Sequence, residues 1–232
     1  MAGERHASLL ARLATYDLDG SPLQQLCTGS LRLLDVKGAA LILMSDQETG
    51  SLAATAGART ASVEDLQFTL GEGPCLQSFQ TGQPVLEPEL LNGARARWPV
   101  FVEAAAALGA RAVFVLPLQI GAARLGVLYV YREEPGLLTA EQFANAFAVA
   151  DIGTWMLLGM QAGADPGELG ADLEGAWSYR AVVHQAAGMI AARLGINLVE
   201  ALARLRGLAF AAERSIYEIA RDVAARRIEV LR

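Results

Sequence analysis

The chain has 232 residues, of which 53% are hydrophobic and 19% charged, and it carries a formal net charge of −6. This length suits one medium-sized domain and one small one, and the apolar content argues against a mainly disordered chain. No uninterrupted apolar stretch approaches the roughly 18 residues of a membrane span. The sequence also does not open on a basic segment followed by an apolar one, so we expect no secretory signal and a cytoplasmic protein.

Cys27 and Cys75 are the only cysteines, which excludes a disulfide framework and any metal or iron–sulfur site with four thiolates from one chain. A histidine-ligated haem is not expected, because His6 is the only histidine in the first 161 residues. Acidic residues with metal-ligand spacing are also lacking. Cys75 follows Pro74 at a predicted helix start, so it is either a redox-sensor candidate or a buried small apolar residue. We expect no metal and no cofactor.

The first 161 residues mix helical and extended patterns. Ser21-Pro22 favours a helix start, and Thr139 with Gln142 predicts a capping box. Taken in chain order, the patterns predict helices over 6–18 and 21–34, strands over 38–45 and 51–56 joined by a turn over 46–50, helices over 62–66 and 75–80, strands over 84–86, 111–119 and 124–132, and a helix over 139–161. Two hairpins with helices around them indicate an α+β domain with an antiparallel sheet flanked by helices.

Apolar spacing within two of these elements predicts which side chains face a core. The expected groups are Leu9, Leu10 and Leu13 on one side of the first helix, and Leu125, Val127, Tyr129 and Tyr131 on one face of the last strand, opposite Leu128 and Val130.

Residues 162–172 are predicted to form a linker, because they are rich in glycine and acidic residues, contain Pro166 and lack apolar periodicity. The charge changes sign at the same place. Residues 177–232 hold nine arginines and five acidic residues, a net charge of +4, whereas the rest of the chain carries −10. We therefore expect a domain over 6–161, a linker over 162–176 and a basic domain over 177–232. The basic end points to a nucleic-acid partner, or to an exposed helical surface with ion pairs.

Three short amphipathic helices are predicted after the linker. The first spans 178–194 and ends at Gly195, the second begins after Asn197, and the third begins after Ser215 with Glu218 completing its cap. Such helices with tight connections make a small all-α bundle.

The sequence over 6–161 resembles the GAF family of sensor domains, in the form found in actinobacterial regulators. The resemblance rests on Gly71-Glu-Gly-Pro-Cys75, Thr81-Gly-Gln-Pro-Val85, Arg97-Trp98-Pro99, Val115–Leu118 and Leu125–Leu128. It implies a small-molecule site between the sheet and the helices over one face, with a lining that includes Gly71, Gly73, Cys75, Trp98 and Phe101. Such glycines let the backbone turn, and Trp98 can stack on a planar ligand or simply pack in the core.

The segment from 177 onwards resembles the ANTAR family. The matching residues are Val183–Ile190, Leu194-Gly195, Glu200-Ala201, Leu205-Arg206, Ala209-Phe210, Ser215-Ile216 and Ile219–Val223. The resemblance implies binding of paired RNA hairpins and prevention of transcription termination. The residues it offers to RNA are Arg180, His184, Arg193, Arg204, Arg214, Ser215, Tyr217 and Arg221. Many ANTAR domains have lysine where this chain has Ala187, and Gly188 is expected to allow close approach of a helix or of RNA.

The function expected from both resemblances is signal-responsive antitermination by a homodimer, in which the signal alters the 139–161 helix and this helix pairs across the dimer. That helix carries Phe143, Phe147, Ile152 and Trp155. Two alternatives stay open: a helix-turn-helix-like DNA-binding regulator, and a dimerisation or relay module without nucleic-acid affinity. No Ser/His/Asp set and no P-loop is present, so catalytic activity is not expected.

Overall fold

The computed structural model describes residues 2–16, 19–44, 50–121, 123–163, 182–183, 185–212 and 214–228. Within these ranges lies a five-stranded sheet made of β1 (Gly38–Met44), β2 (Gly50–Ala56), β3 (Val85–Glu87), β4 (Ala112–Ile120) and β5 (Ala123–Arg132). The strand order is β2-β1-β5-β4-β3, and every neighbouring pair is antiparallel. The sheet confirms the predicted α+β class. Residues 46–49 of the turn predicted over 46–50 lie outside the described residues, and Gly50 begins β2.

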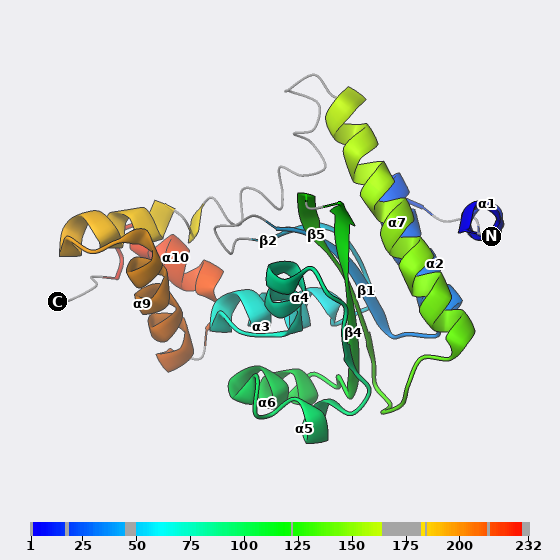
Figure 1. Cartoon of the computed structure of the whole chain (residues 1–232). Coiled ribbons are helices and arrows are strands. Elements are labelled where there is room, and N and C mark those ends of the chain that lie inside the picture. The colour runs from blue at the N-terminus through cyan, green and yellow to red at the C-terminus, as the bar shows by residue number, and fades with distance from the viewer. Residues whose placement is uncertain are drawn as a thin grey trace.

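Two helices cover one face of the sheet, α2 (Pro22–Leu34) and α7 (Ala140–Gly163), and α1 (Ala2–Ala14) packs on them from outside (Figure 1). Their starts follow the predicted caps. The Ser21 hydroxyl accepts a hydrogen bond from the Gln24 N–H at 3.3 Å, and Thr139 and Gln142 bond each other's backbone N–H groups at 3.2 and 2.9 Å. The prediction for Leu10 is wrong: its side chain is 43% exposed, because only the Leu9 flank of α1 packs against this layer.

Four helices cover the opposite face: α3 (Thr60–Leu70), α4 (Pro74–Thr81), α5 (Leu90–Gly93) and α6 (Pro99–Ala107). The helix predicted over 62–66 is longer in the structure, because Val63 and Phe68 are both buried and stabilise both of its ends. The helices α5 and α6 were not among the expected elements. The start of α6 depends on a group from another part of the chain, described below, which local sequence does not reveal.

One side chain of β5 lies on the face opposite to its predicted one. Val127 and Tyr129 face α3–α6 as expected, whereas Leu125 packs on the side of α1, α2 and α7. The pairing of β4 with β5 shifts register between Leu118 and Gln119, which leaves Leu125 as an extra residue in β5. An extra residue reverses the alternation of side chains on the far side of such a bulge.

The helix α7 has the length and composition of a membrane span: residues Ala140–Met160 have a mean hydropathy of 1.3. Half of that segment is buried inside the protein, against α2 and β4. A core helix of a soluble domain has the same properties, so its composition alone is weak evidence for insertion into a membrane. Its outward side carries Trp155, 67% exposed, and Phe147, 37% exposed.

The C-terminal part is a helical domain with an apolar core. It contains a helix over 185–194, α9 (Leu198–Ala211) and α10 (Ile216–Ala224), seen beside α3 in Figure 1. Gly195 ends the first helix with φ +67°, Asn197 caps α9, and Ser215 with Glu218 forms a complete capping box on α10. The apolar sides of these three amphipathic helices meet in one cluster. Its fully buried members include Val183, Ala186, Ala187, Leu205, Ala209, Ile216 and Ala220.

The first helix of this domain agrees with one observation from the sequence and corrects one expectation. Ala187, an uncharged residue, is fully buried among the three helices, so this position offers no surface to a phosphate. Close helix packing at Gly188 is not seen: this residue is exposed, and no described atom lies within 4 Å of where a Cβ would stand. The helices instead meet at Ala186 and Ala187, and the open surface at Gly188 faces solvent.

Candidate functional site

The sensor domain holds a buried polar cluster between α3, α4 and β5. The Gln67 side chain bonds Cys75 twice: its amide oxygen accepts from the Cys75 N–H at 2.8 Å, and its Nε2 donates to the Cys75 Sγ at 3.1 Å. Tyr129 is fully buried nearby, and its hydroxyl has no hydrogen-bond partner among the described residues. Burial raises the pKa of Tyr129 well above its usual value of 10, with the neighbouring Cys75 as a second cause. The hydroxyl is therefore a neutral donor inside the domain.

The predicted glycine loop lies over this cluster and is anchored to α6. Gly73 has φ +142°, and a Cβ there would stand 2.5 Å from the Gln67 Oε1, so only glycine allows this approach. Between the two glycines, the Glu72 carboxylate accepts hydrogen bonds from the Val100 and Phe101 N–H groups at 2.9 and 2.8 Å. A carboxylate at a helix N-terminus is stabilised by the N–H groups that have no partner inside the helix. Glu72 thus couples the loop to the start of α6.

Three other predicted lining residues lie on the same side of the sheet, but inside packed structure. Cys75, Trp98 and Phe101 are all buried in one cluster with Tyr129. The rings of Trp98 and Phe101 meet edge to face at 6.3 Å, and the Arg97 guanidinium covers the Trp98 ring at 4.5 Å. The protein's own groups therefore occupy the space around the Trp98 and Phe101 rings where a ligand was expected. A ligand would contact these rings only after α6 moved.

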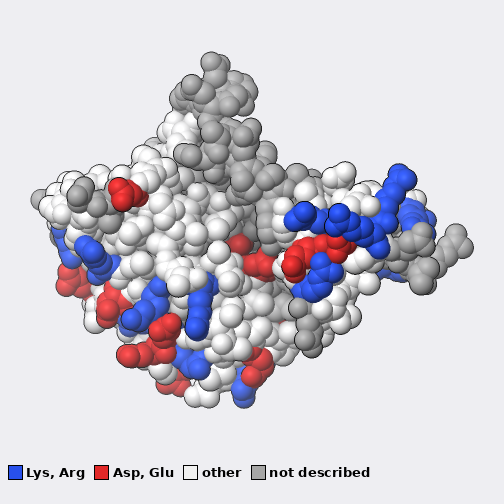
Figure 2. Space-filling model, turned by 180° about the vertical axis from the view of Figure 1, so that it is seen from behind, with Lys and Arg blue, Asp and Glu red and all other residues white. Residues whose placement is uncertain are grey.

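The arginines of the C-terminal domain gather on its surface, with acidic side chains among them (Figure 2). Two of the predicted RNA-binding residues, Arg180 and His184, lie outside the described residues. Of the described ones, Arg193, Arg204, Arg214 and Arg221 are exposed. Arg204 pairs with Glu200 one turn away at 3.4 Å, and the Arg221 guanidinium lies over the Tyr217 ring at 5.8 Å.

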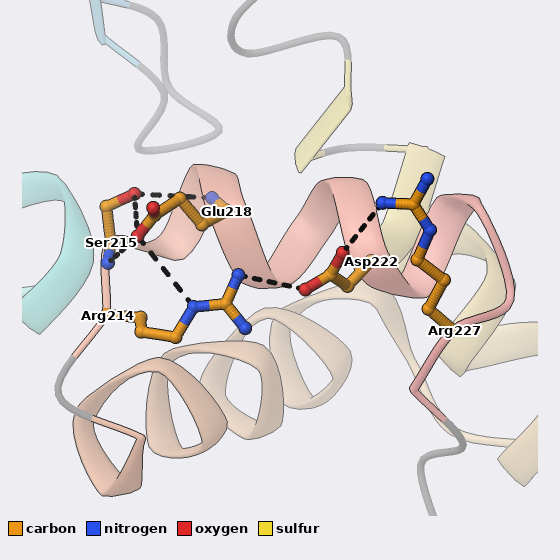
Figure 3. A network of polar contacts seen from close by, with 5 residues as sticks. All are labelled: Arg214, Ser215, Glu218, Asp222 and Arg227. Carbon is orange, nitrogen blue, oxygen red and sulfur yellow. Dashed lines mark hydrogen bonds and ion pairs between the residues drawn. The ribbon is translucent and has the colours of Figure 1, made fainter.

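Arg214 and Ser215 have local partners on α10 (Figure 3). The Arg214 guanidinium lies 2.9 Å from the Asp222 carboxylate and 3.9 Å from that of Glu218, and Arg227 reaches Asp222 from the other side at 3.5 Å. The hydrogen bond from Arg214 is the main cause that lowers the pKa of Asp222 below its usual value of 3.8. The Ser215 hydroxyl accepts from the Glu218 N–H at 3.2 Å. Both residues therefore hold the start of α10, where a phosphate would have to compete with Glu218.

The two domains touch at the end of α3. Phe68, on α3, is buried in the core cluster of the C-terminal domain. Arg206, on α9, donates from Nε to the Phe68 carbonyl at 3.2 Å, and its guanidinium would lie 2.9 Å from a Cβ at Gly71. Gly71 was expected in the ligand lining, but the structure places it at this contact. The contact therefore includes the first residue of the loop over the Gln67–Cys75 cluster.

Gln67 and Phe68 had no signal in the sequence, because both lie beyond the helix predicted over 62–66 and act through partners that only the fold brings near. Glu72 and Tyr129 stood in predicted elements, the glycine motif over 71–75 and the last strand, but their partners were not predicted. Arg206 was among the residues of the C-terminal resemblance, but as one of nine arginines in its segment it was not expected at a contact between the domains. In the part of the chain that the structure describes, no group of three His, Cys, Asp or Glu side chains is placed to hold a metal ion.

Comparison with known proteins assigns both parts of the chain. The model described as GAF domain matches residues 23–153, and the model described as ANTAR domain matches residues 171–223. The solved GAF domain of a phosphoenolpyruvate-protein phosphotransferase from Acinetobacter is 12% identical, with a TM-score of 0.52 over 70% of this chain and 96% of that one. Its counterpart from Coxiella burnetii is 17% identical, with a TM-score of 0.51 over 69% and 95%. No curated protein matches the chain.

These two structures support the fold alone, because their identity to this chain is low. The GAF match covers more than half of the sequence, and the ANTAR match takes in the three-helix domain. The chain belongs to the GAF domain family and carries an ANTAR domain on its C-terminal side.

Proposed function

We propose that this protein is a cytoplasmic, signal-responsive antitermination regulator that binds paired RNA hairpins through its C-terminal domain. ANTAR domains are RNA-binding antitermination modules and GAF domains sense signals. The observation that carries the proposal is the location of charge in the three-helix domain: its core is apolar, and six of its described arginines are exposed, namely Arg193, Arg204, Arg214, Arg221, Arg226 and Arg227. RNA loops offer phosphates and unstacked bases, which arginine and tyrosine recognise. The proposed organisation is a sensor domain over 6–161, a linker over 162–176 and the RNA-binding domain over 177–232.

The RNA-binding surface is proposed to centre on Tyr217 and Arg221. They lie one helical turn apart on α10, with the Arg221 guanidinium over the Tyr217 ring at 5.8 Å, and both planar groups are of the kind on which a base stacks. Arg193 and Arg204 add exposed positive charge from the other helices, and Arg180 and His184 complete the proposed set. Arg214 and Ser215 contribute indirectly by holding α10.

The sensing site is proposed between the sheet and the loop over 71–75, close to Gly73, Cys75, Trp98 and Phe101, while Gly71 at the start of this loop lies against Arg206. A small ligand with a hydrogen-bond acceptor would satisfy the Tyr129 hydroxyl, whose burial without a partner is costly. Seating such a ligand requires α3 or α6 to shift. Since α3 ends in the contact made by Phe68 and Arg206, a shift of α3 would reach the RNA-binding domain directly. This route is proposed beside the expected one through the 139–161 helix.

The helix α7 is proposed, as the sequence suggests, to form the surface that joins two chains. Phe147 and Trp155 are two turns apart on its outward side, and exposed aromatic side chains on one helix face mark an interaction site. A dimer would present two RNA-binding domains to two hairpins. Trp155→Glu should convert the dimer to a monomer in light scattering. Leu137→Glu, which alters a residue 74% exposed outside α7, should leave the dimer intact.

The test of RNA binding uses the full chain and a pool of two-hairpin RNAs with randomised loops. The proposal predicts enrichment of particular loops, and affinity that falls with salt. Arg221→Ala should lower the salt slope by about 1, whereas Arg95→Ala, the same charge change in the sensor domain, should not alter it. Equal binding to duplex DNA of any sequence, or no enrichment by the folded dimer, would contradict the proposal and favour the DNA-binding or relay alternatives.

A further inference from the structure

A pocket of about 550 Å³ opens between the helix over 185–194 and the end of α10. Its volume lies within the range of roughly 300–1,000 Å³ that is usual for ligand sites. The wall is apolar, formed by Met189, Ile190, Val223 and Ile228, of which Ile190 and Val223 are buried in the domain core. Ala192, an exposed residue, forms part of its edge. The surface of the domain thus contains an apolar concavity.

Two arginines, Arg193 and Arg226, belong to the same lining. Both are exposed, and none of the described lining residues is acidic. Two acidic residues adjoin the lining in the sequence: Asp222 pairs with Arg214 and Arg227, which do not line the pocket, and Glu229 lies outside the described residues. The pocket therefore combines an apolar wall with positive charge at its opening, a combination that suits a flat ring bearing an anionic group.

The backbone after α10 holds this arrangement in place. Arg226 has φ +55°, in the left-handed region, and its N–H donates to the Val223 carbonyl at 2.9 Å. This turn ends the helix and brings the chain back, so that Ile228 packs on the domain core. A left-handed residue costs conformational energy unless it is glycine, yet the chain has arginine here. Glycine would form this turn more easily, but arginine at this position brings a positive side chain to the pocket.

We propose that this pocket receives one splayed nucleotide of the RNA loop, with its base against Met189 and Ile190 and its phosphate between Arg193 and Arg226. The inference rests on the proposed RNA binding and adds a base-binding subsite to it. Single-stranded loops can turn a base out of the stack, and such a base gains affinity from an apolar or aromatic surface together with arginine. A free nucleotide has the same chemistry, so the test must distinguish the two sources.

The experiment uses the full chain and an RNA enriched from the two-hairpin pool, with 2-aminopurine placed at each loop position in turn. Binding should change the fluorescence at one position. Arg226→Gly should weaken binding about tenfold and lower the salt slope by roughly 0.7–1. Because glycine relieves the left-handed φ, this variant should be at least as thermally stable as the wild type, so that lost binding is not lost folding.

A second variant separates the base from the phosphate. Ala192→Phe fills the edge of the pocket, so it should weaken binding about tenfold, abolish the fluorescence change and leave the salt slope unaltered. Ala203→Phe, at an exposed alanine of α9 outside the pocket, is its control and should bind as the wild type does. Wild-type affinity in both Arg226→Gly and Ala192→Phe would overturn the subsite while leaving the proposed RNA binding intact.

The remaining outcomes are also decisive. If the wild type enriches no RNA from the pool, the proposed function and the subsite both fail. If adenosine monophosphate raises the melting temperature of the wild type but not of Ala192→Phe, and RNA affinity is equal in the two proteins, the pocket takes a free nucleotide. That result would overturn the assignment to an RNA loop.

Discussion

The two domains place their polar side chains in opposite locations. The sensor domain has polar groups inside, where Gln67 bonds Cys75 and the Tyr129 hydroxyl is buried without a partner among the described residues. The C-terminal domain has an apolar core, and its charged network of Arg214, Asp222 and Arg227 lies on the surface. A buried polar group is costly unless it is satisfied, whereas a surface ion pair changes stability little.

This difference fits two separate tasks. A buried polar group without a hydrogen-bond partner makes the packing around it sensitive to any ligand that can form that hydrogen bond, as a sensor requires. A charged surface over an apolar core can exchange its partners without unfolding the domain, as binding to phosphates requires. Phe68 joins the two, because it belongs to a helix of the sensor domain and to the core of its neighbour.

Phe68→Ala should produce the largest change. Truncation of a buried phenylalanine costs about 3–5 kcal/mol, and here the loss falls on the contact between the domains. We expect faster hydrogen exchange in α9 and α10 and a lower melting temperature. Phe147→Ala, at an exposed position of α7, should leave exchange in those helices unaltered. Unaltered exchange in Phe68→Ala as well would show that the domains fold independently of this contact.

The same leucine-to-alanine change in the core of each domain should affect the folding of the two domains differently. Leu116 in the sheet and Leu205 in α9 are both fully buried, and each change to alanine should cost about 2–5 kcal/mol. The small three-helix domain has less buried surface to spare, so Leu205→Ala should unfold it at 37 °C while Leu116→Ala stays folded. Exchange measured peptide by peptide distinguishes the two. Persistence of protected amides in α10 of Leu205→Ala would argue against this difference.

Gln67→Leu tests the interior of the sensor domain. The substitution leaves the buried Cys75 N–H without its acceptor, so we expect a loss of about 1–3 kcal/mol in the free energy of unfolding. Urea denaturation followed by tryptophan fluorescence measures it. Gln25→Leu, at an exposed glutamine of α2, serves as the control and should lie close to the wild type. If Gln67→Leu lost as little stability as Gln25→Leu, the Cys75 N–H would have found another acceptor.

Asp222→Asn should give the smallest effect, and one that depends on pH. Because Arg214 lowers the pKa of Asp222 in the folded state, this carboxylate stabilises the protein above its usual pKa of 3.8 and ceases to do so as the pH falls through the lowered value. The drop in melting temperature of the C-terminal domain between pH 6 and pH 3 should therefore be smaller in Asp222→Asn than in the wild type. High salt should reduce the difference between the two proteins, since the pairs are near the surface. An identical drop in both proteins would show that the Asp222 carboxylate does not stabilise α10.

The sequence by itself determined the elements that depend on neighbours a few residues apart. Helix starts at Ser21, Thr139, Asn197 and Ser215 followed from capping patterns, because a cap bonds N–H groups two or three residues away. The apolar sides of the three C-terminal helices followed from periodicity, because apolar residues that recur with the helical repeat all lie on one side of a helix and face the core.

The tertiary structure alone decided the features that depend on residues far apart in the chain. The bulge at Leu125 arises from pairing with β4, the start of α6 is capped by Glu72, and Gly71 faces Arg206 rather than a ligand lining. In the same way Trp98 and Phe101 became core residues, and Arg214 became a partner of Asp222. Local patterns carry no information on such contacts, because the partners come close only when the sheet, the helices over it and the C-terminal domain have packed.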